Sequence, residues 1–251
     1  MTWIRAAMLW CTATLSAHAS IVNVLSPDVG NPDDGWDSSA KLSLQHLSGN
    51  EQKLTFSLLA GTRYVAGPNQ VLLKGSADWG EASNEVYSKK AFAHLRWKRR
   101  LNPTWSAFTF AQVDHNEFRS LLMRDLAGVG FEARLIQSDH FDLAIATSAM
   151  AELEWVLEQE KPEALSWRSS NYMTLAWQPN EQLTVGSTTF LQPLFKAFSD
   201  IRGFQQVDFN IVVNKYISFT TRWKLEFDTE PAESDVEELD SSITSGLKVR
   251  W

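Results

Sequence analysis

Apolar and polar residues alternate with a period of two along most of the chain. Such alternation indicates β-strands whose two faces meet different surroundings, because successive side chains point to opposite sides of a sheet. The clearest run is residues 241–251, where Ile243, Leu247 and Val249 share one face and the chain stops on Trp251. Runs of this kind, bounded by turn residues, predict strands over residues 36–48, 54–66, 70–79, 86–101, 104–114, 120–136, 141–153, 166–177, 182–194, 201–213, 217–227 and 238–251.

The connections between these predicted strands alternate in length. Short turns are expected at residues 67–69, 102–103, 137–140, 179–180 and 214–215, and longer, mostly charged connections at 115–119, 153–165 and 228–237. Short turns at one rim and longer loops at the other are typical of bacterial outer-membrane barrels, which have an even number of strands. The sequence therefore predicts an all-β fold: a single antiparallel transmembrane β-barrel of about 12 strands in meander topology, with both chain ends at the short-turn, periplasmic rim.

Aromatic residues favour a membrane barrel over a soluble one. The chain has 11 Trp, 14 Phe and 4 Tyr. Wide amphipathic rings suit the two membrane–water interfaces, and eight Trp lie near the ends of predicted strands: Trp36, Trp79, Trp97, Trp105, Trp167, Trp177, Trp223 and Trp251. A soluble periplasmic ligand-binding β-barrel, with its apolar face inside, is the alternative. The net charge of −7 offers no basic field for nucleic acid.

The first 19 residues have the features of a cleaved secretory signal. Arg5 precedes the apolar stretch 6–15, and Ala17 and Ala19 are small residues at the positions that a signal peptidase reads. A lipoprotein anchor on Cys11 is disfavoured because bulky residues precede it, and the apolar stretch is too short to span a membrane. We therefore expect export through a signal peptide over residues 1–19, a barrel domain over residues 20–251, and no cysteine after cleavage.

The end of the chain carries an expected membrane-insertion signal. Leu247, Val249 and Trp251 form the apolar face of a final strand that ends on an aromatic residue. This arrangement resembles the C-terminal signal that the barrel-assembly machinery reads in bacterial outer-membrane barrels. We therefore expect the protein in the outer membrane of a Gram-negative cell, in contact with outer-membrane lipids and lipopolysaccharide.

Three stretches in the first half of the chain resemble the salt-induced outer membrane protein family, a group of small barrels under a domain of unknown function. These are residues 91–105 (AFAHLRWKRRLNPTW), 110–118 (FAQVDHNEF) and 124–135 (RDLAGVGFEARL). The matching features are the turn at Asn102 and Pro103, the corner at residues 114–118, and Gly128 and Gly130. The resemblance implies an outer-membrane location and supplies no catalytic motif.

Charged residues on the polar faces are candidates for the lining of a lumen. The selected bases are Arg96, Lys98, Arg134, Arg222, Lys224 and Lys248. They could line a water-filled passage that favours small anions, or belong to a salt-bridged filling. A barrel of about twelve strands has a narrow lumen, and side chains that could fill it include Phe92, Phe108, Phe110 and Phe204.

Two acid-rich segments are predicted to be external loops, residues 152–163 and 228–240. The favoured interpretation is a pair of solvated loops, and weak divalent-cation binding at the lipopolysaccharide surface is the alternative. No spacing resembles a known metal motif, so neither a metal site nor a cofactor is predicted.

One pair of residues in the sequence could support an enzymatic function. His46 and Ser48 stand two residues apart near the outer rim, a spacing that an outer-membrane lipid hydrolase could use as base and nucleophile. No orienting third residue is identifiable. We therefore predict that the protein is not an enzyme, and that it serves envelope maintenance or forms a narrow channel for small solutes.

Overall fold

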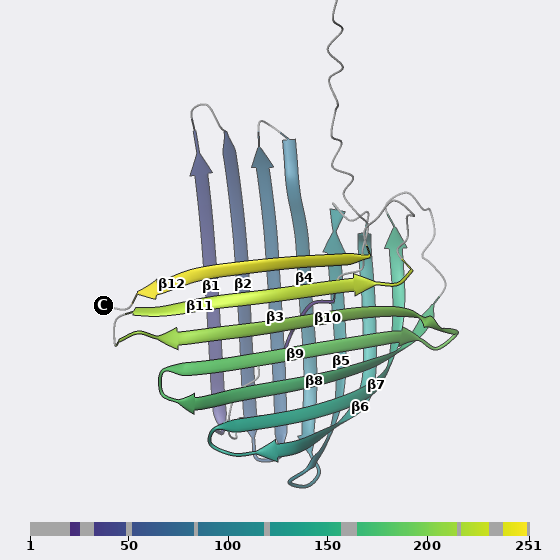
Figure 1. The fold of residues 1–251 in the computed structure, drawn as a ribbon. Helices are drawn as coiled ribbons and strands as arrows, with labels where there is room; N and C mark the ends of the chain where they lie inside the picture. Colours follow the sequence, from purple (N-terminus) through teal and green to yellow (C-terminus); the bar gives the residue numbers. More distant parts are fainter. Residues whose placement is uncertain are drawn as a thin grey trace, which may run out of the picture.

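The computed structural model describes residues 21–25, 33–48, 52–82, 85–117, 121–156, 165–214, 217–230 and 238–249. They form one antiparallel sheet of twelve strands that pair in sequence order (Figure 1). The strands are β1 (Gly35–Leu47), β2 (Lys53–Ala66), β3 (Asn69–Ala82), β4 (Glu85–Arg100), β5 (Trp105–Asn116), β6 (Leu121–Gln137), β7 (Phe141–Val156), β8 (Ser166–Asn180), β9 (Leu183–Leu194), β10 (Ala197–Val212), β11 (Ile217–Asp228) and β12 (Leu239–Val249).

The all-β fold, the number of strands and the meander order are confirmed. Figure 1 shows a strongly coiled sheet, in which β1–β4 run almost at right angles to β8–β12. Within the described residues β1 and β12 are not hydrogen-bonded to each other, so the sheet keeps two edges. β1 and β12 run in opposite directions, as the strands that close a barrel with an even strand number must.

The short-turn rim is built from side-chain-capped turns. The Asn102 Oδ1 atom accepts hydrogen bonds from the backbone N–H groups of Thr104 and Trp105 at 2.9 and 2.8 Å, between β4 and β5. Asn180 does the same between β8 and β9, and Gly67 adopts a left-handed φ of 54° between β2 and β3. These local bonds explain why sequence composition located these turns well.

Several strand ends differ from the sequence expectation. β10 begins at Ala197, four residues before the predicted Ile201, and its pairing with β9 shifts register between these two residues. β7 runs to Val156, so Glu152 and Glu154 belong to a strand and not to an external loop. Asp228 likewise ends β11. The interpretation of these three acids as loop residues was wrong, because arginines inside the sheet pair with them.

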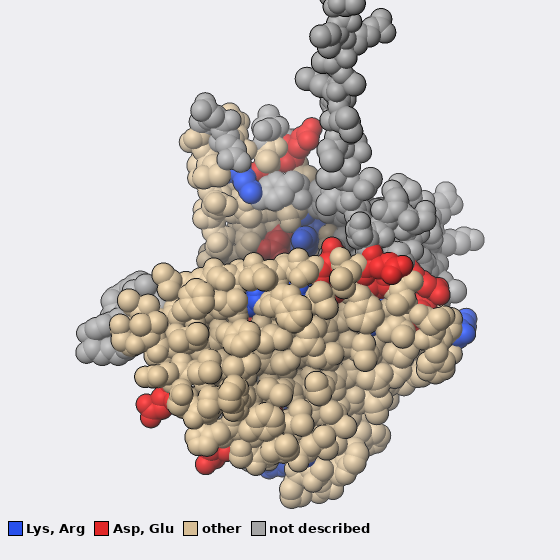
Figure 2. Space-filling model, viewed as in Figure 1, with Lys and Arg blue, Asp and Glu red and all other residues tan. Residues whose placement is uncertain are grey.

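The outer face of the sheet is apolar. Outward side chains with large exposed areas include Leu42, Leu95, Val129, Ile243 and Leu247. Figure 2 shows the outer face over the strands nearest the viewer almost free of charge, with acids and bases gathered at its edges. A face of this kind suits contact with lipid.

Aromatic residues lie on this outer face near both ends of the strands. At the short-turn rim the Trp36 and Tyr64 rings stack with centroids 4.6 Å apart, and Trp97, Trp105 and Trp177 lie at the same end of their strands. At the opposite rim lie Phe56, Trp79, Trp155 and Trp167. The strands hold 11 to 17 residues, and a tilted membrane-crossing strand needs about 9–11.

Some sequence predictions fall outside the described residues. These are the signal peptide over residues 1–19 with Cys11, the insertion-signal residue Trp251, and the side chains of Lys248 and Val249. Among the described residues, no helix is long and apolar enough to cross a membrane.

Candidate functional site: the lumen face of the sheet

A row of aromatic rings crosses the inner face of the sheet at mid-height. The rings of His94, Phe110, Phe108, Tyr172, Phe190 and Phe204 follow one another with centroid separations of 5.6 to 6.4 Å. These residues come from β4, β5, β8, β9 and β10. Phe204 is 1% exposed and Phe108 is 4% exposed. The row therefore forms an apolar layer inside an otherwise polar interior.

Two glycines make room for this layer. Gly130 and Gly128 on β6 pair with Phe108 and Phe110 on β5. A Cβ atom on Gly128 would lie 2.5 Å from the Phe110 ring, and one on Gly130 would meet the Phe108 ring and the backbone of β7. The two phenyl rings thus lie flat over a strand that has no side chain there, which gives a physical reason for the two glycines noted in the sequence.

A network of buried arginines and carboxylates lies between this layer and the long-loop rim. Arg168, whose side chain is 5% exposed, bonds Glu152 at 2.9 Å and Asp200 at 2.8 Å. Arg202 bonds the other Glu152 oxygen at 2.8 Å and Asp228 at 3.3 Å. The remaining members are Arg124, Asp114 and Glu154. Three bases and five acids from six strands are tied together, as buried charges require.

A second polar cluster lies on the other side of the aromatic layer. Arg96 lies over the Phe108 ring, 3.9 Å from its centroid, and donates a hydrogen bond to the Tyr172 hydroxyl. Tyr172 donates in turn to Glu132 at 2.6 Å, and Lys98 donates to the same carboxylate at 3.0 Å. The phenol therefore connects the aromatic layer to the charges around it.

The other predicted lumen bases are also paired. Arg134 lies 3.2 Å from Asp142, Arg222 lies 2.6 Å from Asp208, and Lys224 pairs with Glu226. Five of the predicted lumen bases are described, and they pair with four carboxylates on the same side of the sheet. The bases are Arg96, Lys98, Arg134, Arg222 and Lys224, and the carboxylates are Glu132, Asp142, Asp208 and Glu226. This near balance reduces the expected preference for anions, because most of the positive charge is neutralised locally.

The lumen face of the remaining strands mixes small residues with larger ones, among them Lys41, Leu59, Arg63, Lys74 and Asp78. The register carries this face from β4 to β1 on one side and from β10 to β12 on the other. The positions it reaches include Ser39, Ser43, Ser57, Gly61, Ser76, Thr220, Ser242, Thr244 and Gly246. These small side chains take up less volume than the rings of the aromatic layer.

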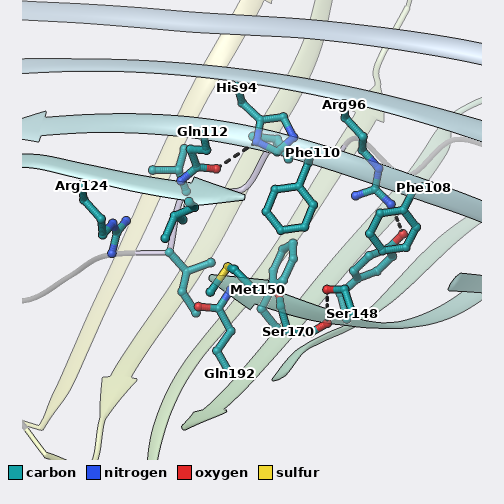
Figure 3. A pocket seen from close by; sticks show the side chains of 16 residues that line it. His94, Arg96, Phe108, Phe110, Gln112, Arg124, Ser148, Met150, Ser170 and Gln192 are labelled. Atoms are coloured by element: carbon teal, nitrogen blue, oxygen red, sulfur yellow. Dashed lines mark hydrogen bonds between the residues drawn. The ribbon is translucent and has the colours of Figure 1, made fainter. Parts of the chain in front are cut away.

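Between the aromatic layer and the arginine network a cavity of about 40 Å³ remains. Figure 3 shows His94, Gln112 and Phe110 on one side of it and Met150, Ser170 and Gln192 on another. Its volume accommodates only a few water molecules. Ile21, Val22 and Val24 also line it, so the chain upstream of β1 enters the lumen.

Sequence reasoning found part of this site. It placed Phe92, Phe108, Phe110 and Phe204 in the lumen, and all four face inward with the paired bases. It missed Arg168 and Arg202, the Tyr172 and Phe190 rings, and the segment at Ile21. Period-two alternation from Arg168 to Tyr172 would have placed both residues on one inward face, but nothing in the sequence pairs them with Glu152.

The alternative catalytic pair lies at the edge of the sheet. His46 is on the exposed outward face of β1, and Ser48 follows the end of that strand. Among the described residues, no group of three His, Cys, Asp or Glu could hold a metal ion. The acidic residues 231–237 lie outside the described residues, so cation binding there remains a prediction.

Comparisons with known proteins identify a family and two similar structures. The family described as "Protein of unknown function, DUF481" matches residues 40–251. A NanC porin structure has 8% identity and a TM-score of 0.49, covering 86% of this chain and 99% of its own. A structure from a study of in-meso crystallization of membrane proteins has 11% identity and a TM-score of 0.37, covering 86% and 83%. No curated protein matches. The salt-induced property stays a prediction, because the matched description does not name it.

Proposed function

We propose that this chain, which belongs to the family of proteins of unknown function, is an outer-membrane β-barrel that forms a narrow passage for small polar solutes. The family description names no activity, so the proposal is argued from the geometry of the sheet. The observation that carries the proposal is the division between the faces. Paired charges, hydroxyls and amides lie inside, and the outer face is apolar with aromatic residues near both ends of the strands. A soluble ligand-binding barrel would have the opposite arrangement.

Closure of the barrel follows from the two free edges. β1 and β12 are 13 and 11 residues long, and each carries apolar residues on its outward face, with Leu44 and Ile243 about 70% exposed. Long unpaired edges cannot stay in lipid, where each backbone polar group needs a partner. We propose that β1 and β12 pair in the membrane after the barrel-assembly machinery has read the C-terminal strand.

The position of the passage follows from the small residues. Once β1 meets β12, the serine, threonine and glycine positions of β1–β3 and β11–β12 lie together opposite the aromatic layer. Large paired side chains fill the other side of the lumen. The passage is therefore narrow and lined by hydroxyls together with acids and bases such as Lys74 and Asp78. We expect weak ion selectivity because both signs of charge line it.

Two measurements test this function in sequence. First, the outer-membrane fraction is run on a denaturing gel with and without boiling, where a closed barrel shifts in mobility only after heating. Second, the purified barrel is placed in a planar bilayer, where we expect small conductance steps with weak ion selectivity. Arg222→Met, which leaves Asp208 unpaired beside the small-residue side, should shift selectivity toward cations.

The contrary outcomes are distinct. A soluble periplasmic protein with no heat-dependent shift would remove the membrane barrel and direct attention to a ligand inside the sheet. A heat-modifiable barrel that never conducts would remove the passage. The protein would then serve envelope structure. Its outer face would contact lipid and lipopolysaccharide, and the arginine network would brace the sheet from inside.

A further inference from the structure

The segment Ile21–Leu25 lies inside the lumen, although it belongs to none of the strands. Ile21 is 8% exposed and Val24 is 5% exposed. Ile21 belongs to the buried cluster of Phe108, Tyr172, Phe190 and Phe204, and Leu25 packs against the same cluster. In Figure 1 this purple segment lies within the curve of the sheet, away from the start of β1.

The chemistry of the segment matches the place that it occupies. Residues 21–25 read Ile-Val-Asn-Val-Leu, which has four aliphatic side chains and no charge. The aromatic layer is the main apolar surface of the described lumen, and the arginine network and the Tyr172 cluster lie on either side of it. The single polar side chain, Asn23, accepts a hydrogen bond from the backbone N–H of Leu25 at 3.0 Å, so its oxygen is satisfied within the segment.

We propose that residues Ile21–Leu25 are a built-in plug of the lumen, and that their withdrawal widens the passage. This inference rests on the proposed function. The plug contacts rings from β5, β8, β9 and β10 and lines the remaining 40 Å³ cavity with Ile21, Val22 and Val24. The seated segment therefore restricts the lumen at the aromatic layer, and the path along the small-residue side becomes the remaining route.

The sequence next to the plug allows it to leave without unfolding a strand. Nine residues, 26–34, connect Leu25 to the start of β1, and they include two prolines, Pro27 and Pro32. Fully extended, nine residues reach about 30 Å. At the base of β1, the Asp34 carboxylate accepts a hydrogen bond from the Gly67 N–H at 3.2 Å, in the β2–β3 turn. This bond holds β1 at the short-turn rim independently of the plug.

Seating of the plug is only weakly favoured. Burial of Ile21 and Leu25 against the aromatic rings is favourable, but it is opposed by the ordering of five residues that no sheet hydrogen bonds hold. A molecule with an aliphatic or aromatic part that enters the lumen can therefore compete for the same rings. The expected ligand class is a small amphipathic solute, whose apolar part replaces Ile21 and whose polar part meets Gln112, Gln192 or Ser170.

Conductance tests the plug directly. A chain lacking residues 21–25 should form a heat-modifiable barrel with larger conductance steps than the full chain. Ile21→Asp with Val24→Asp should give the same increase, because two carboxylates cannot remain among the rings. The matched control, Ile21→Val with Val24→Ile, keeps the apolar contacts and should conduct like the full chain. Equal conductance in all four proteins would overturn the plug and leave the passage standing.

Cysteine labelling provides a readout that does not depend on conductance. In a chain with Cys11→Ser, Val24→Cys should react with a membrane-impermeant maleimide more slowly than Ser43→Cys on the small-residue side, because Val24→Cys is accessible only while the plug is withdrawn. Equal labelling at both positions would overturn the seated plug. A protected Ser43→Cys would instead count against the water-filled passage, and the plug would then be decided by whether the chain lacking residues 21–25 conducts.

Discussion

The lumen faces of β4–β10 and of the edge strands β1–β3 and β11–β12 are built differently. The first region presents aromatic rings and buried arginine–carboxylate pairs to the interior, with Arg168, Glu152 and Phe204 all 4% exposed or less. The second mixes serines, threonines and glycines with charged residues such as Lys41, Lys74 and Arg222, and the inner face of β1 is exposed from Asp37 onward. One region therefore braces the sheet, and the other leaves room for water.

The difference shows how one repeating strand pattern supports two roles. The outward face is apolar in both regions, so period-two alternation alone does not distinguish them. What changes is the volume and the pairing of the inward residues. Large residues that meet partners from several strands fix the shape of the sheet, and small hydroxyl residues at the edges allow β1 and β12 to meet around an open space.

The largest effect is expected from breaking the arginine network in the braced region. Arg168→Met removes the partner of both Glu152 and Asp200 and the donor to the Gln192 carbonyl. Asp200 then lacks its ion-pair partner, and Glu152 keeps Arg202 but loses one of its two close cations. This should lower the free energy of unfolding by about 3–5 kcal/mol. The measurement is urea-induced unfolding of the barrel in lipid vesicles.

The matched substitution in the edge region is Arg63→Met. Arg63 bonds Asp37 at 2.9 Å, but the Asp37 side chain is 70% exposed. The loss should be about 0–1 kcal/mol, as for other exposed pairs. Similar losses for Arg63→Met and Arg168→Met would show that the two regions do not differ as described.

A smaller effect is expected from filling the space below the aromatic layer. A Cβ atom at Gly130 would meet the Thr147 backbone oxygen and the Phe108 ring, so one of them must move. Gly130→Ala should cost about 1–3 kcal/mol through overpacking. The shift in the temperature at which the barrel loses its compact mobility on a gel measures this cost.

The edge region again supplies the control. A Cβ atom at Gly246 on β12 would meet only the Thr220 hydroxyl oxygen, at 3.7 Å, an ordinary contact distance. Gly246→Ala should leave the unfolding temperature unchanged. An unaffected Gly130→Ala barrel would mean that the aromatic layer tolerates displacement and does not brace the sheet.

These contrasts also mark how far the sequence could predict the structure. Alternation and turn residues located all twelve strands, because each depends on neighbours in the chain, as the Asn102 turn illustrates. The Arg168–Glu152–Arg202 contacts could not be predicted in the same way. They join β7, β8 and β10, and the partners of an inward charge depend on strand register and coiling, which local composition does not specify.

The position of the plug, like the arginine contacts, could not be predicted from local sequence patterns. Residues 21–25 have the composition of a short strand, yet they lie apart from the sheet, on rings contributed by β5, β8, β9 and β10. Their place depends on an apolar surface that exists only after these strands have assembled. A sequence pattern can indicate that such a segment is apolar, but not which surface covers it.

Among the three substitutions expected to destabilise the barrel, the smallest effect is expected at the short-turn rim, which both regions share. Asn102→Ala removes the side-chain acceptor for the N–H groups of Thr104 and Trp105, but these groups are exposed and water can replace it. The cost should be about 0.5–1.5 kcal/mol, the usual net value of such a bond. Urea unfolding measures this cost, with Asn180→Ala in the β8–β9 turn as the comparison. Asn180 makes the same two bonds at 2.9 Å and also lies within the region β4–β10. Equal losses would therefore assign the cost to the turn bonds themselves, whereas a much larger loss at Asn180 would mean that the β8–β9 turn also contributes to the bracing.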